Sequence, residues 1–179
     1  MKATGIVRRI DDLGRVVIPK EIRRTMRIRE GDPLEIYTTR EGEVIFKKYS
    51  LLGGLEDFAA QFCDALNRTS GFTAAVTDRD AVIAITGAGK RELLGKSLSE
   101  ALSRVMEERR IYCCQGADQP LPVTDGNDRY TAAVAAPILC EGDRLGLGLF
   151  LSAEGQIPGE GEYKLAQTVS AFLGKHMEA

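Results

Sequence analysis

Residues 11–29 of the chain, DDLGRVVIPKEIRRTMRIR, decide the fold of its N-terminal part. Gly14 can adopt the positive φ of a tight turn, the β-branched run at 16–18 favours a strand, and Pro19 suits the first position of a helix. In that helix Ile22 and Met26 are four residues apart and can both face inward, which turns the arginines between them outward. The sequence therefore predicts a strand that leads directly into a short helix with a basic face.

Positive charge is concentrated in this first part of the chain. Up to Ser50 the sequence has 12 Lys and Arg against 8 Asp and Glu, a net charge of +4, which leaves −6 for the remainder because the whole chain carries −2. Eight basic side chains but only three acidic ones lie between Arg8 and Arg29. A merely solvated surface mixes the two signs, so this one-sided pattern indicates a polyanionic partner for the N-terminal part.

Four short strands are expected around this helix, at residues 4–10, 16–18, 34–39 and 43–48. Glu41 and Gly42 are typical of the tip of a hairpin between the last two strands. In the first strand Arg8 and Arg9 point to opposite faces, and the alternation does not decide which of them is outward. Such short strands bury too little apolar surface to be stable alone, so we expect pairing with a second copy of the chain.

This region resembles the AbrB-type swapped-hairpin DNA-binding domain of bacterial transition-state and sporulation regulators. The resemblance spans residues 1–50 and rests on the Gly-Arg-Val-Val-Ile-Pro run at 14–19, the arginine pair after it, and the Gly-Asp before the last hairpin. It implies that two chains exchange hairpins to form one β-barrel, and that four arginines face the DNA: Arg8, Arg15, Arg23 and Arg24. The charge pattern leaves three further candidates open, which are Arg9, Lys20 and Arg27.

From Leu51 onward the pattern changes, and Gly53-Gly54 is expected to be the joint. Apolar periodicity predicts an amphipathic helix at 55–66, a hairpin of 72–77 with 81–86, and a helix at 90–110 with a possible internal start near Ser97 and Ser99. Short strands and loops follow at 113–124, then a hairpin of 130–140 with 145–152, and a last helix at 161–177.

This order of elements resembles a GAF domain, as do Ala136-Pro137-Ile138 and the Gly-rich strand 144–150 that follows. We therefore expect two domains: residues 1–52, a swapped-hairpin β-barrel formed by a dimer, and residues 53–179, an α+β GAF-like domain for regulation and oligomerisation. The apolar stripes of its first and last helices favour a homotetramer built from two barrel dimers. No signature for a bilin, haem or cyclic nucleotide is visible, so no cofactor is expected and the ligand-binding residues stay unknown.

Catalytic and metal-binding patterns are weak in this sequence. The run Thr86-Gly87-Ala88-Gly89-Lys90 lies between a strand and a helix as a phosphate loop would, but Ala84 and Arg91 occupy the positions that need Gly and Ser or Thr. The only histidine, His176, is near the C-terminus and reads as an exposed helix-end residue. The four cysteines lack the spacing of zinc sites and the density of a disulfide scaffold, so we expect reduced, mostly buried thiols at Cys63, Cys113, Cys114 and Cys140. We expect no metal site, no catalytic residue and no enzyme.

The resemblance implies a sequence-specific transcriptional regulator that binds double-stranded DNA, activating some genes and repressing others late in endospore formation. An unknown small molecule or protein is the expected effector of the GAF-like part. No window of about 18 apolar residues is present, so we expect no membrane partner and a cytoplasmic, nucleoid-associated protein. An antitoxin that regulates its own gene remains an alternative, because related swapped-hairpin barrels serve in toxin–antitoxin pairs. A small-molecule-processing enzyme is a further alternative for which no sequence feature speaks.

Overall fold

The structure is a computed structural model that describes residues 4–49, 52, 55–116, 119–153 and 155–177. Its internal contacts divide the chain into two compact units, Met1–Tyr49 and Ser50–Ala179. The joint expected at Gly53-Gly54 lies outside the described residues.

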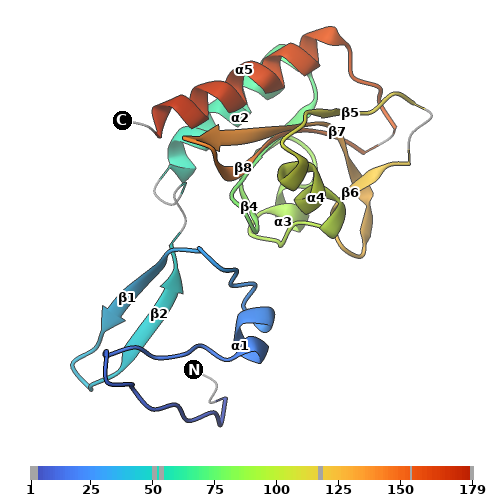
Figure 1. Cartoon of the computed structure of the whole chain (residues 1–179). Coiled ribbons are helices and arrows are strands. Elements are labelled where there is room, and N and C mark those ends of the chain that lie inside the picture. The colour runs from blue at the N-terminus through green and yellow to red at the C-terminus, as the bar shows by residue number, and fades with distance from the viewer. Residues whose placement is uncertain (1–3, 50–51, 53–54, 117–118, 154, 178–179) are drawn as a thin grey trace. The chain divides into compact units, whose positions relative to one another are not determined.

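The N-terminal unit contains one short helix and one hairpin, drawn in blue in Figure 1. Helix α1 (Lys20–Thr25) begins directly after Pro19, one residue later than the sequence predicts. Strands β1 (Leu34–Thr38) and β2 (Val44–Lys48) pair antiparallel, with Ile36 opposite Phe46. Gly42 closes the hairpin with a φ of 84°, a value that favours glycine. The predicted hairpin is therefore confirmed.

The strands expected at 4–10 and 16–18 are wrong for the single chain, in which the described residues of both segments form no strand. Between them the chain makes a turn in which the Asp11 N–H donates to the Arg15 carbonyl at 3.0 Å and Gly14 has a φ of 74°. A strand exists only through hydrogen bonds to a neighbouring strand. The β-branched pattern records a preference for such pairing, but it does not supply the partner.

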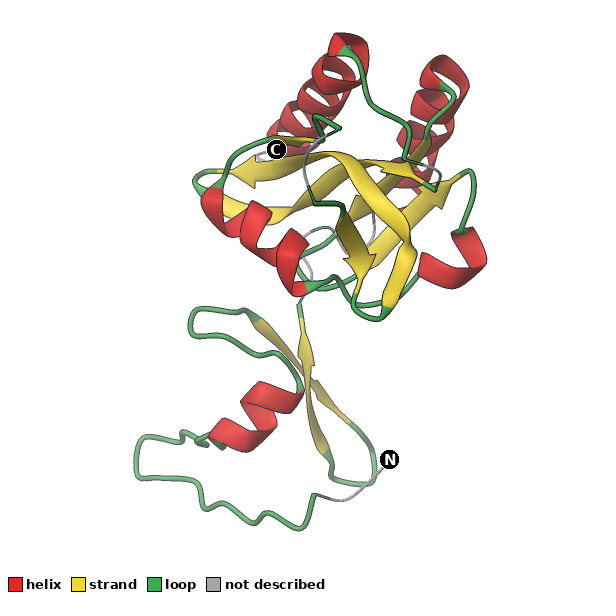
Figure 2. Ribbon diagram, turned by 90° about the vertical axis from the view of Figure 1, so that its right-hand side faces the viewer, coloured by secondary structure: helices red, strands yellow, loops and turns green. Residues whose placement is uncertain are grey.

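The C-terminal unit is an antiparallel sheet with helices on both faces, as Figures 1 and 2 show. The strand order is β4-β3-β8-β7-β5, and β6 pairs with β7 beside this path. The strands are β3 (Thr73–Thr77), β4 (Val82–Thr86), β5 (Tyr112–Cys113), β6 (Leu121–Thr124), β7 (Asn127–Cys140) and β8 (Asp143–Ser152). Helices α2 (Glu56–Ser70) and α5 (Glu160–His176) cover one face, and α3 (Lys90–Leu93) and α4 (Glu100–Glu108) the other. The order of elements that suggested a GAF domain is confirmed.

The single helix expected at 90–110 is wrong, because two helices occupy that range. Gly95 has a φ of 72°, and Ser97 forms a β-bridge with Ala81, so the chain between α3 and α4 cannot be helical. Helix α4 begins at the expected internal start. The Ser99 hydroxyl accepts a hydrogen bond from the Leu102 N–H at 3.1 Å and donates one to the Pro122 carbonyl at 2.7 Å.

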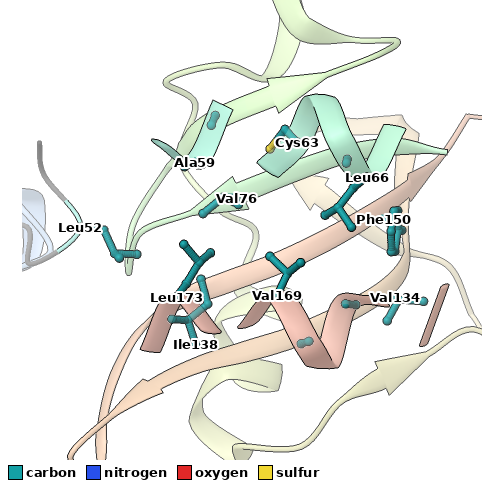
Figure 3. Close-up of a cluster of buried hydrophobic side chains, with 14 of the residues drawn as sticks. Leu52, Ala59, Cys63, Leu66, Val76, Val134, Ile138, Phe150, Val169 and Leu173 are labelled. Atoms are coloured by element: carbon teal, nitrogen blue, oxygen red, sulfur yellow. The ribbon is translucent and has the colours of Figure 1, made fainter. Parts of the chain in front are cut away.

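Buried apolar side chains form one cluster on each face of this sheet. On the face under α2 and α5, drawn in Figure 3, the helices contribute Ala59, Cys63, Leu66, Val169 and Leu173, and the strands contribute Val76, Val134, Ile138 and Phe150. On the other face, α3, α4 and the loop between them contribute Leu93, Leu98, Leu102 and Met106. The C-terminal unit therefore has a complete core of its own.

Helix α5 approaches the sheet through small residues. A Cβ at Gly174 would overlap the Leu139 carbonyl oxygen of β7, and a Cβ at Gly148 of β8 would lie 2.5 Å from the Ser170 Oγ. The Ser170 hydroxyl donates to the Ala136 carbonyl at 3.0 Å. The contact at Gly148 explains one glycine of the Gly-rich strand, because a side chain there would push the helix away from the sheet. Gly146 of the same strand lies instead against the Thr77 carbonyl of β3.

The thiols are less buried than expected. Cys63 is fully buried, whereas Cys113, Cys114 and Cys140 are partly exposed. Within the described part of the chain, no group of His, Cys, Asp and Glu side chains is arranged to hold a metal ion. No described helix combines the length and the apolar character needed to cross a lipid bilayer.

Candidate nucleic-acid interface

All seven basic side chains singled out in the sequence are exposed. Three of them flank the turn at Gly14, namely Arg8, Arg9 and Arg15, and four belong to α1 or follow it, namely Lys20, Arg23, Arg24 and Arg27. Among the described residues, no carboxylate forms a salt bridge with Arg23 or Arg24. These two arginines therefore present their charge to solvent, where a phosphate can reach them.

Arg15 is held in place by Asp11. The Arg15 Nε lies 2.7 Å from Asp11 Oδ2, while Asp11 Oδ1 accepts the backbone N–H groups of Arg15 at 2.7 Å and Leu13 at 3.1 Å. The backbone N–H of Arg15, and then its guanidinium, lower the pKa of the Asp11 carboxyl below its usual value. The carboxylate thus fixes both the turn and the direction of the arginine.

Arg27 does not share a helical face with Arg23, although the two residues are four apart in the sequence. Helix α1 ends at Thr25, and Arg27 has a φ of 51°, in the left-handed region. Lys48 of β2 donates from Nζ to the Arg27 carbonyl at 3.0 Å. Sequence reasoning missed Lys48, because the link between the end of α1 and the hairpin is made in three dimensions and leaves no periodic signal.

Apolar side chains of the N-terminal unit are largely exposed in the single chain. Among its described residues only Pro19 is buried, and Met26, expected to face inward, is 56% exposed. Val7 is 88% exposed and Val17 is 70% exposed, and five further apolar side chains are also exposed: Ile10, Leu13, Ile36, Val44 and Phe46. The unit therefore combines a basic surface with a large apolar surface that its own chain leaves uncovered.

Known proteins match the two units of the chain separately. A family model described as "Antidote-toxin recognition MazE, bacterial antitoxin" matches residues 7–50, and one described as "Stage V sporulation protein T C-terminal, transcription factor" matches residues 54–178. The transition state regulatory protein AbrB of Bacillus subtilis (strain 168) is 63% identical over 49 residues, which are 27% of this chain and 50% of AbrB. The GAF domain of the nutrient sensor CodY from Clostridium difficile is 14% identical, with a TM-score of 0.48, over 66% of this chain and 83% of that one.

An AbrB-type DNA-recognition domain followed by a GAF-like domain defines a two-domain transcription factor. Stage V sporulation protein T of Bacillus subtilis (strain 168) is 48% identical over 178 residues, 99% of each chain. This chain belongs to the stage V sporulation protein T family.

Proposed function

We propose that the chain regulates transcription late in sporulation by binding specific DNA sites, activating some genes and repressing others. The observation that carries the proposal is the exposed basic surface made by the seven side chains around the Gly14 turn and α1. Phosphate contacts from such side chains supply affinity, while base contacts and the deformability of the duplex supply specificity.

Pairing of two N-terminal units into one swapped-hairpin barrel is part of this proposal. A unit with Val7, Val17 and Ile36 exposed has not buried enough apolar surface to offset the entropy of folding. A second copy would cover these side chains and give the segments at 4–10 and 16–18 the strand partners that they lack. The pairing would also place two basic surfaces on one DNA duplex.

A second interface is proposed at the aromatic cluster Phe58, Phe62, Phe172 and His176, which joins α2 to α5. The Phe58 ring lies 5.1 Å from the Phe62 ring and stacks on the His176 ring at 4.8 Å. Phe172 packs against Phe62 at 5.4 Å but remains 50% exposed. A second GAF-like domain would bury this cluster, so that two barrel dimers form a tetramer.

An antitoxin is the competing function, favoured by the family model that matches residues 7–50. Antitoxins of this kind carry a short acidic segment that folds on their toxin. Here residues 55–177 instead fold around two buried clusters. This folded unit, together with the match to stage V sporulation protein T over 99% of the chain, supports regulation of transcription by a domain that responds to a ligand or a partner protein.

The test of the DNA surface is an electrophoretic titration of Arg15→Ala, Arg23→Ala and Arg24→Ala against duplexes selected from a random pool by the unchanged protein. Each variant should lose about 1–3 kcal/mol of binding free energy if its contact is bidentate to a base, and the salt slope should fall by about 1 for each lost phosphate contact. Arg91→Ala, an exposed arginine of α3, serves as the matched control and should bind normally. Normal affinity in all three variants, with intact folding by circular dichroism, would refute the proposed surface.

A further inference from the structure

A groove of about 380 Å3 runs along α5 on the side away from the aromatic cluster. Its walls come from three segments: the chain after α4, the end of β7, and α5. Ile111, Pro137, Leu139 and Ala171 give it an apolar lining. Phe172, the next residue on α5, points instead toward α2, where it contacts Phe62. The groove and the proposed interface therefore use opposite flanks of the same helix.

The floor of the groove is fixed by the contacts that hold α5 on the sheet. Ser170 donates its hydroxyl to the Ala136 carbonyl, and Gly174 packs directly on the Leu139 carbonyl. The last pairing between β5 and β7 joins Tyr112 to Ala135, so β5 does not cover β7 beyond that point. Pro137 has no N–H to offer at this edge, which disfavours the addition of a peptide strand and leaves room for a small molecule.

Two cations line this groove in a part of the chain that is acidic as a whole. Arg109 comes from the chain after α4 and Lys175 from the last turn of α5, and no acidic residue is among the lining side chains. Within the described residues no carboxylate forms a salt bridge with Arg109. Arg109 has a φ of 56° at the C-cap of α4, a position where glycine is the usual residue. The backbone thus adopts a costly conformation at a residue whose side chain lines the groove.

We propose that this groove binds a small organic anion that has an apolar body. Arg109 and Lys175 would hold the anionic group, because charge-assisted hydrogen bonds to a carboxylate are stronger than neutral ones. Ile111, Pro137, Leu139 and Ala171 would cover the apolar body. The volume, about 380 Å3, falls within the range of roughly 300–1,000 Å3 typical of small-molecule sites.

This inference names the ligand class for the sensing role proposed above, and it rests on that role only for the effect on DNA. Helix α5 carries both the groove and half of the aromatic cluster, so a ligand that shifts α5 would also shift the proposed interface. The ligand can change DNA affinity only by as much as it prefers one arrangement over another, typically about 5- to 150-fold.

Calorimetric titration of the full chain with octanoate and with phenylacetate tests the site, with octanamide and phenylacetamide as the neutral counterparts. We expect at least one carboxylate to bind more than about tenfold tighter than its amide, since a hydrogen bond to a charged group is stronger than one to a neutral group. Arg109→Gln and Lys175→Gln should each weaken binding about tenfold, and Ala171→Phe should abolish it by filling the groove. Arg110→Gln, next to Arg109 but outside the lining, is the matched control and should bind normally.

Equal binding of carboxylates and amides, or no binding of either, would overturn the proposal, as would normal binding by both Arg109→Gln and Ala171→Phe. Adding the carboxylate that binds to the DNA titration then tests separately whether binding in the groove changes the affinity for DNA. Unchanged DNA affinity at saturating carboxylate would leave the site standing and refute its role in sensing.

Discussion

At the scale of single residues, Cys63 shows how burial controls the chemistry of a side chain. It lies on α2 within the cluster under α2 and α5, with none of its surface exposed. Burial raises the pKa of its thiol to about 12, although a hydrogen bond with the Val76 backbone acts in the opposite direction. Cys63 is therefore a neutral, apolar core residue at physiological pH.

A loss of stability in alkaline solution follows from this pKa. The pKa of this thiol is near its ordinary value of 9.0 in the unfolded chain and about 12 in the folded chain. Between these values the unfolded state releases its proton first, so the contribution of Cys63 is fully present below about pH 9 and falls as the pH rises toward 12. In urea unfolding at pH 8, 9 and 10, the free energy of unfolding of the unchanged protein should fall by up to about 1.4 kcal/mol per pH unit more than that of Cys63→Ala. Identical pH slopes in the unchanged protein and in Cys63→Ala would contradict this assignment.

At the scale of elements, the position of α5 depends on backbone-to-backbone approach. Gly174 touches the Leu139 carbonyl and Gly148 faces Ser170, so the helix sits closer to the sheet than larger residues would allow. The close contact between α5 and the sheet fixes Ala136 and Leu139 as the floor of the groove. It also determines how far Phe172 lies from the sheet in the aromatic cluster.

Two glycines of α5 should respond in opposite ways to the same change. Gly174→Ala should destabilise the C-terminal unit by about 1–3 kcal/mol, because its Cβ meets backbone that cannot move aside. Gly161→Ala should be neutral or stabilising by up to about 1 kcal/mol, since a Cβ there meets no atom of the described residues within 4 Å and alanine favours the helix. Chemical denaturation of both variants measures the difference. Equal effects would show that helix propensity, and not the contact with β7, decides.

Elements with local signals were predictable from the sequence, and those that depend on distant contacts were not. The hairpin around Gly42 and the apolar stripes of α2 and α5 carry their own periodicity. By contrast, the range 90–110 reads as one helix, because the bridge from Ser97 to Ala81 that interrupts it joins segments far apart in sequence. The exposure of the basic side chains follows from their charge, whereas the choice of Arg8, Arg15, Arg23 and Arg24 among them comes from the family resemblance. The Lys48 contact to the Arg27 carbonyl and the groove at Arg109 arise only when separate elements meet.

At the scale of the whole molecule, the two proposed interfaces should be separable by single substitutions in the full chain. Phe172→Glu places a charge in the aromatic cluster, where burial by a second copy would be costly. We expect light scattering to show a tetramer for the unchanged protein and a dimer for this variant. Leu94→Glu, at another exposed apolar residue of the C-terminal unit, should remain a tetramer. A monomer or an unchanged tetramer for Phe172→Glu would contradict the assignment of the second interface.

The exposed apolar side chains of the N-terminal unit predict how a damaged gene copy behaves beside a normal one. A chain with Arg23→Ala keeps the apolar surface, so it should enter mixed barrels and disable the normal chains that it joins. A chain with both Val17→Asp and Phe172→Glu should fail to pair through either proposed interface, because a charge would be buried at each contact, and it should leave the normal chains to one another. In a strain that carries two copies, measured by the output of heat-resistant spores, the first allele should be dominant and the second recessive. A mutant chain that can still pair is therefore expected to be dominant, and a mutant chain that cannot pair is expected to be recessive.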